Sequence, residues 1–199
     1  MSLIPKNVFR ASLAGSISLA LAGCISLGAE PPEQLLTLTS TASGPMSLAT
    51  DGQLSNALLI EEPDAPQRLA VTRVPVKVND SSIAYLKEAV WVERPSRLFR
   101  RLLAETVRAK SNRLVMERDD PTVVSAETLG GTLREFGYDA DNRNVVVSFD
   151  AMRTMAGGRI ETRRFESTVP NVEPEAVPVG AALNVAANDV AEQVANWII

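Results

Sequence analysis

The sequence predicts an α+β fold in which two main helices pack against one mixed, largely antiparallel sheet. Two segments repeat apolar residues at helical spacing, while several others alternate apolar and polar residues or are short apolar runs between turn residues. Three of these strand-like segments follow one another late in the chain with only short turns between them. The expected order is β-β-β-β-α-β-β-β-β-α, which describes an α+β sandwich.

The composition excludes many functions before any motif is considered. The 199 residues include no histidine and one cysteine, and the net charge is −4. Without histidine, Ser-His-Asp and Cys-His catalysis and His-ligated metals are impossible. A single cysteine excludes an internal disulfide and a multi-cysteine zinc site. The acidic balance argues against nucleic acid as a partner, and the length suits one domain with a tail.

Residues 1–23 have the pattern of a secretory signal peptide. Lys6 and Arg10 form a basic start, and residues 11–22 are apolar or small. This run is too short for a membrane-spanning helix, which needs about 20 apolar residues. Its end, Leu-Ala-Gly23-Cys24, is similar to the lipobox of bacterial lipoproteins. The resemblance implies cleavage between Gly23 and Cys24 and acylation of Cys24. The less favoured alternative is that the N-terminal segment is a buried helix and Cys24 an ordinary buried cysteine.

Residues 24–33 are predicted to be a lipidated tether between this anchor and a domain that occupies residues 34–199. The segment is short, polar and contains two prolines, and ten extended residues span at most about 33 Å. Bacterial lipoproteins retained at the inner membrane usually carry Asp directly after the cysteine. Ile25 therefore favours anchoring to the periplasmic face of the outer membrane.

The first part of the domain is predicted to hold four strands, separated by a Ser/Thr/Gly-rich loop at 40–55 and by prolines. These strands are Gln34–Thr39, Asn56–Glu61, Arg68–Val74 and Ser82–Leu86. Pro75 lacks an N–H donor, so the third strand is expected to end there or to lie at a sheet edge.

The first helix is predicted over Pro95–Lys110, with Ser96 as its N-cap. Its apolar residues lie at spacings of three and four and form one stripe, composed of Leu98, Phe99, Leu102, Leu103 and Val107. Four arginines, Arg97, Arg100, Arg101 and Arg108, lie mostly off this stripe. A short strand is expected to follow at Arg113–Glu117.

The second part is predicted to be an antiparallel meander followed by a closing helix. Its strands are Thr128–Ala140, Val145–Met152 and Arg159–Val169, joined by turns at 141–144 and 157–158. The glycine pair Gly130-Gly131 is expected to mark a bulge or a bend. The final helix is expected from about Gly180 to the end, with one buried face of Leu183, Ala187, Val190, Val194 and Trp197.

We predict no catalytic residue, metal or cofactor, because no nucleophile–base pair and no phosphate-binding glycine motif is present. Candidate partner-binding residues are Tyr85, Trp91, Arg97 and Arg101. The two aromatics fit either a core or an interface anchor, and the two arginines fit either a solvated helix face or a contact with an acidic partner or lipid headgroups. An exposed strand edge could pair with a partner strand and permits a homo-oligomer.

With these elements placed, the chain resembles the ABC-type transport auxiliary lipoproteins, the group that includes the lipoprotein of the paraquat-inducible (Pqi) system. The resemblance rests on their order along the chain: Cys24, the early strand in 35–38, the segment 68–73, Ile83-Ala84-Tyr85, Trp91 with Glu93 and Pro95, and the Arg/Leu-rich helix. The sequence departs from the family in two places. The early strand lacks its tyrosine, and 75–81 lacks the usual leucines.

The resemblance implies a fold similar to the N-terminal domain of TolB, without cofactor or catalytic residues. It also implies a non-enzymatic partner of an MCE-type (mammalian-cell-entry) lipid transporter. In such systems an ATPase and a permease lie in the inner membrane, an MCE-domain protein bridges the periplasm, and the lipoprotein joins it at the outer membrane. The alternative prediction is a structural or assembly lipoprotein of the outer membrane that is unrelated to transport.

Overall fold

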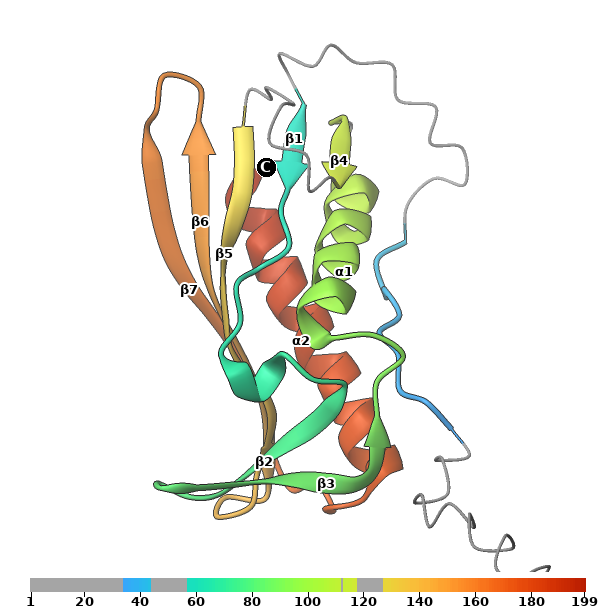
Figure 1. Cartoon of the computed structure of the whole chain (residues 1–199). Coiled ribbons are helices and arrows are strands. Elements are labelled where there is room, and N and C mark those ends of the chain that lie inside the picture. Colours follow the sequence, from blue (N-terminus) through green and yellow to red (C-terminus); the bar gives the residue numbers. More distant parts are fainter. Residues whose placement is uncertain (1–33, 44–56, 112, 118–126) are drawn as a thin grey trace, which may run out of the picture. The chain divides into compact units, whose positions relative to one another are not determined.

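The computed structural model describes residues 34–43, 57–111, 113–117 and 127–199, which all belong to one unit spanning Pro32–Ile199. Within these residues, seven strands form one mixed sheet and two α-helices pack against it (Figure 1). The elements are β1 (Leu58–Ile60), the 3-10 helix η2 (Gln67–Leu69), β2 (Arg73–Asn79), β3 (Ser82–Val90), α1 (Pro95–Lys110), β4 (Val115–Glu117), β5 (Glu127–Asp139), β6 (Asn144–Met155), β7 (Ile160–Val169) and α2 (Ala176–Ile198). The predicted α+β class is confirmed.

Strand β5 organises the sheet because it pairs along both of its edges. On one side it runs antiparallel to β6, which pairs in turn with β7, so the predicted meander is confirmed. On the other side β5 pairs in parallel with β1 near its start and with β2 near its end. Strand β4 extends the sheet from β1, and β3 extends it from β2. The β2–β3 hairpin therefore reaches away from the rest of the sheet as an arm (Figure 1).

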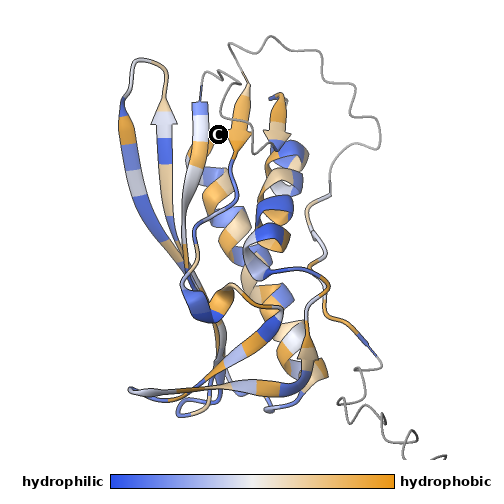
Figure 2. Cartoon of the chain, in the orientation of Figure 1, coloured by the Kyte–Doolittle hydropathy of each residue, from blue (hydrophilic) through white to orange (hydrophobic). Residues whose placement is uncertain are grey.

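Helices α1 and α2 cover one face of the sheet, and their apolar residues face inward. The predicted stripe of α1 is buried in full, as are Leu183, Ala187, Val190 and Val194 of α2, while Trp197 is half-buried. The hydropathy of each helix accordingly alternates around its axis (Figure 2). Among the described residues, no helix is both long enough and apolar enough to cross a membrane.

A chain of aromatic rings joins the helix layer to the sheet. Trp91, which directly follows β3, contacts Phe136 of β5 edge-on, with ring centroids 5.5 Å apart. Phe99 of α1 lies between Phe136 at 6.5 Å and Phe149 of β6 at 5.3 Å, again edge-on. These rings are almost fully buried, and edge-to-face pairs add roughly 0.5–1.5 kcal/mol each beyond the area that they bury. They join the segment around the start of α1 to the β5–β6 hairpin, about 40 residues further along the chain, in one core.

The other face of the meander is polar. Arg164 of β7 makes two hydrogen bonds to Asp150 of β6, at 2.5 and 2.8 Å, and Arg134 of β5 lies 3.5 Å from the same carboxylate. The Arg164 hydrogen bonds hold the pKa of Asp150 below its usual value, so the carboxylate stays charged near neutral pH. This face, which no described helix covers, is the one on which the candidate site lies.

The prediction of a strand over Gln34–Thr39 is wrong, because this segment does not form a strand. Leu36 alone makes a bridge, which is parallel to Trp91, and the following main chain turns to side chains of α2 instead of a neighbouring strand. The predicted loop is described only at residues 40–43, where no helix or strand occurs, and residues 44–56 lie outside the described part. Three strands thus precede α1 in the described residues, instead of four.

The predicted strand Arg68–Val74 is also placed differently. Its first residues form η2, and β2 begins at Arg73 and continues through Pro75. The strand passes Pro75 because the pairing with β3 breaks there: Arg73 pairs with Val90, whereas Pro75 pairs with Tyr85. The extra residues on β3 form a bulge, in which Glu88 has φ of 60°. Because the ladder is interrupted there, Pro75 is not required to donate an N–H to the neighbouring strand. Strand β3 extends beyond its predicted end to Val90.

Two local expectations are corrected as well. The glycine pair of β5 is in regular register, and the irregularity lies between Leu133 and Glu135. Gly131 is needed for a different reason: its φ is +134°, and an added Cβ would lie 2.0 Å from the main-chain oxygen of Asp150. Ser96 is not the N-cap, which is Arg94.

The final helix begins at Ala176, earlier than predicted. Pro178 lies in its first turn, where N–H groups have no partner within the helix, so the proline costs no hydrogen bond there. The helical hydrogen-bond pattern starts at Val179, whose N–H donates to the carbonyl of Glu175.

Candidate interaction groove

A groove of about 490 Å³ lies between the β2–β3 arm and the end of the β5–β6 hairpin. Strand alternation places Pro75 and Lys77 of β2 on the groove side of the arm, with Ile83 of β3 opposite Lys77. Gly137 and Val146 contribute from β5 and β6. The apolar part of the wall is partly open, since Ile83 is 52% exposed. The groove therefore offers both apolar contact area and polar groups.

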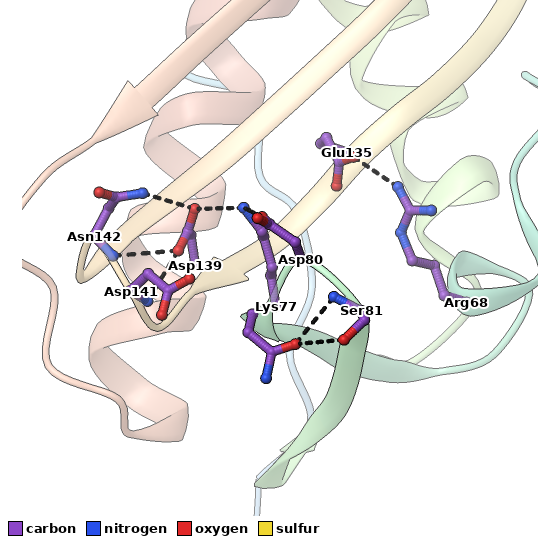
Figure 3. A network of polar contacts seen from close by, with 9 residues as sticks. Arg68, Lys77, Asp80, Ser81, Glu135, Asp139, Asp141 and Asn142 are labelled. Atoms are coloured by element: carbon purple, nitrogen blue, oxygen red, sulfur yellow. Dashed lines mark hydrogen bonds and ion pairs between the residues drawn. The ribbon is translucent and has the colours of Figure 1, made fainter.

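Lysine 77 is the central cation of this groove (Figure 3). Its Nζ lies 3.3 Å from Oδ1 of Asp80 and 3.9 Å from Oδ2 of Asp139. The hydrogen bond to Asp80 and the negative charge of Asp139 raise the pKa of Lys77 above its usual value, so the amine remains protonated. A protonated amine can hold an anionic or carbonyl group but cannot act as a nucleophile.

Aspartate 139 is fixed by the turn that follows β5. Its Oδ1 accepts the main-chain N–H groups of Asp141 and Asn142, and its Oδ2 accepts from the Asn142 side chain at 3.0 Å. Removal from solvent favours the neutral acid, but these hydrogen bonds and Lys77 outweigh it and lower the pKa of Asp139. The predicted turn at 141–144 is thus confirmed and also holds a charged group in place.

An ion pair separates the groove from a second hollow of about 500 Å³ along β5. One guanidinium nitrogen of Arg68 lies 2.7 Å from Oε1 of Glu135 and 2.6 Å from the carbonyl oxygen of Arg134. Arg68 and Glu135 line both hollows, and the second also includes Asp64 and Thr132. This side-chain pair therefore forms part of the wall of both hollows.

The polar groups of the groove are engaged with one another. The Ser81 hydroxyl is hydrogen-bonded to Asn79, and Lys77 is paired. Among the described residues, no group of three or more acidic, Cys or His side chains could hold a metal ion. The groove offers an apolar strip flanked by paired charges of both signs, which suits a mixed polar and apolar ligand or a polypeptide segment.

The predicted partner-binding residues lie in different environments, and none of the four lines the groove. Trp91 is in the core and 2% exposed. Tyr85 is half-buried on the arm, where its hydroxyl donates to the carbonyl of Arg68 at 3.4 Å and its ring lies 4.8 Å from the Arg73 guanidinium. Tyr85 thus positions the main chain of Arg68, a groove residue that sequence reasoning had not selected as a site residue.

The two candidate arginines of α1 make ion pairs within the chain. Arg101 lies 2.6 Å from Oε1 of Glu93, and Arg97 lies 3.8 Å from the same side chain and 3.5 Å from Glu62. Both arginines are nearly half-exposed, so part of each guanidinium still faces solvent. Cys24 and Gly23, the predicted lipidation and cleavage residues, lie outside the described residues.

Sequence reasoning also missed a polar site on α2. Asn184 accepts the N–H of Thr39, and Asn188 accepts the N–H and hydroxyl of Thr41 at 2.8 and 3.0 Å. The Asn188 amide donates in return to the carbonyl of Thr39. The signal was two asparagines four residues apart beside an apolar helix face, which a reading of apolar periodicity passes over.

Comparison with known proteins agrees with this architecture. The family model for the ABC-type transport auxiliary lipoprotein component matches residues 36–195. The chain belongs to this family. The match spans nearly all of the described fold, from the Leu36 bridge to the last turns of α2, so it concerns the domain itself and not only a motif at the N-terminus. The predicted family is therefore confirmed.

Solved structures of the same fold include protein XCC0632 from Xanthomonas campestris, a member of family DUF330. It is 17% identical, has a TM-score of 0.67, and the match covers 82% of this chain and 94% of that one. An uncharacterised protein is 15% identical, with a TM-score of 0.63 and coverage of 83% and 100%. These likenesses concern the fold alone. No curated protein matches the chain.

Proposed function

We propose that this protein is an outer-membrane-anchored periplasmic lipoprotein and a non-enzymatic auxiliary component of an MCE-type ABC lipid transport system between the two membranes. The observation that carries the proposal is the family match over residues 36–195, since the family is an auxiliary lipoprotein component of ABC-type transport. An auxiliary component needs a fixed position and a binding surface, and the chain offers a candidate for each.

Cys24 supplies the position. It ends a segment with the pattern of a signal peptide, and acylation there would consume the only thiol of the chain. Several acyl chains at about 0.8 kcal/mol per buried CH₂ would hold the protein firmly on a membrane. Ile25 after the cysteine favours the outer membrane, where the domain would face the periplasm.

The groove supplies the binding surface. Its cations Lys77 and Arg68 are paired with Asp139 and Glu135, Asp139 is itself held by the turn after β5, and Ile83 offers exposed apolar area. Tyr85 supports this site from the arm. Arg97 and Arg101 add a second, half-exposed basic surface on α1. We propose an MCE-domain protein as the partner at the groove.

The decisive experiment is site-specific photo-crosslinking in intact membranes, followed by mass spectrometry of the captured proteins. A photoreactive residue in place of Ile83 in the groove should capture an MCE-domain protein. The same residue in place of Val185, which is similarly exposed on α2, serves as the matched control and should not. Capture of outer-membrane assembly proteins from Ile83, with no MCE-domain protein, would refute the transport role.

A further inference from the structure

The chain leaves the domain toward Cys24 at a defined place. Residues 34–43, here called the strap, are held at Leu36, whose N–H donates to the carbonyl of Val90 at 2.7 Å and whose carbonyl accepts from Val92 at 2.9 Å. Leu36 also packs closely against Gly180 of α2. A Cβ added to Gly180 would lie only 2.6 Å from the Leu36 side chain. The exit therefore lies beside the start of α2, at the end of the domain that carries the β2–β3 arm (Figure 1).

The strap cannot shift easily along the domain. Beyond Leu36, its main chain is held by the side chains of Asn184 and Asn188, which lie one turn apart on α2. Asn188 is 8% exposed, so these hydrogen bonds compete little with water. The distance between the domain and the membrane is then set by the residues between Cys24 and Leu36 alone.

Exposed apolar side chains surround this exit. Leu35 is 53% exposed, Val92 is 45% exposed, and Val177, one turn before Gly180, is 68% exposed. We call Leu35, Val92 and Val177 the exit patch. Val78 on the arm, at the same end of the domain, is 42% exposed. Single exposed apolar residues are common, but three large ones around the point where a lipid tether would begin need a reason.

The tether length supplies that reason. About ten residues reach at most roughly 33 Å, and a domain of this size has a radius of gyration near 15 Å, so the exit end must stay close to any membrane that holds Cys24. A short tether also gives a high effective concentration of the patch at the membrane, and even weak interfacial contacts are then occupied.

We propose that the exit patch rests on the lipid surface in which Cys24 is anchored, so that this end of the domain faces the membrane. The proposal rests on the proposed lipid anchor. The groove lies at the same end of the domain, so its partner would approach close to the membrane. The β6–β7 turn lies at the opposite end and points away from the lipid (Figure 1).

The test uses lipidated full-length protein in vesicles of phosphatidylethanolamine and phosphatidylglycerol that contain a headgroup-nitroxide lipid as quencher. Acylation of Cys24 leaves no native thiol, so a fluorophore can be attached at a single engineered site. Val177→Cys reports on the patch. The matched control is Val185→Cys, on the same helix about 12 Å further along and 59% exposed, and Ile160→Cys reports on the opposite end.

We expect quenching at position 177 to exceed that at 185 and 160 at least several-fold. Adding Leu35→Asp to the Val177→Cys protein should reduce this quenching while sedimentation with vesicles is unchanged. Co-sedimentation with equal quenching at all three sites would overturn the orientation and leave the anchor standing. A label at 177 that is shielded from water but not quenched would mean that a second copy of the chain covers the patch, which also overturns the orientation. Loss of co-sedimentation would refute the anchor itself.

Discussion

Single residues set the electrostatics of the domain through pairing. Glu127 at the start of β5 is 8% exposed and accepts hydrogen bonds from Arg113 at 2.7 Å and from Arg153. Arg153 also donates to the carbonyl of Ile198, so the pair connects the sheet to the end of α2. Burial alone would raise the pKa of Glu127, but the two arginines outweigh it and lower the pKa.

This pairing predicts acid sensitivity. Because the pKa of Glu127 is lower in the folded state, its stabilisation is present above the unfolded value of about 4.3 and is lost as the pH falls through the folded pKa. Glu127→Gln should lower the free energy of unfolding by about 1–3 kcal/mol at pH 7. The difference from wild type should shrink below about pH 4.

Urea unfolding between neutral and acidic pH measures this difference. Glu192→Gln is the control, because Glu192 is exposed and pairs only with Lys110 among the described contacts. It should change stability by less than about 0.5 kcal/mol. A constant difference between Glu127→Gln and wild type across the pH range would show that the charge of Glu127 is not what stabilises the fold.

Trp91 is the second residue whose role follows from its surroundings. Its ring is buried against Phe136, so Trp91→Ala should leave a large cavity and cost about 3–5 kcal/mol. The neighbouring Val92→Ala removes a half-exposed side chain and should cost less than about 0.5 kcal/mol. Thermal or urea unfolding compares the two. Equal small losses would mean that Trp91 does not hold the core together.

At the scale of elements, the strap is held to α2 by side chains and not by a strand ladder. Asn188 accepts and donates hydrogen bonds to residues almost 150 positions earlier in the sequence. A segment with one bridge cannot be stable alone, so the strap depends on Asn184 and Asn188 and on the fit of Leu36 against Gly180.

Asn188→Ala should therefore release the strap without unfolding the domain. We expect the free energy of unfolding to fall by about 1–3 kcal/mol, because buried donors and acceptors lose their partners. Amide hydrogen exchange at Thr41, whose N–H donates to Asn188, should quicken at least about tenfold, while β6 remains protected.

Gln193→Ala removes a nearby α2 side chain that contacts β7 and Asp189, and it serves as the control for this exchange measurement. Exchange in the strap should be unchanged in that variant. Unchanged exchange in Asn188→Ala would show that Leu36 and Asn184 secure the strap without Asn188.

At the scale of the whole molecule, the proposed role depends on where the domain is held. Cys24→Ala should leave the fold intact, because Cys24 lies outside the compact unit Pro32–Ile199, and should release the protein from membranes. Ser26→Ala, two residues further on, should leave the protein membrane-bound. Fractionation of cells with detection of the protein in pellet and supernatant measures this. A Cys24→Ala protein found wholly with the membranes would contradict the anchor.

Local periodicity carried much of the fold prediction. The helix over Pro95–Lys110, its buried stripe and the order of the β5–β7 meander follow from contacts three or four residues apart or across short turns, so the sequence alone reveals them. The family could be recognised for the same reason, because its motifs are short and occur in a fixed order. The groove could not be predicted from the sequence, because Arg68 and Glu135 meet only after η2 has folded back across β5.

The sequence by itself thus determined the α+β class, the two helices, the late meander and a single thiol suited to a lipid anchor. The tertiary structure decided what depends on distant partners: the strand through Pro75, the early segment held by asparagines, and the groove under the arm. The physical reason is that a strand is defined by its neighbours, whereas a helix bonds to itself. The place where the tether leaves the domain, and hence the end proposed to face the membrane, belongs to this second group.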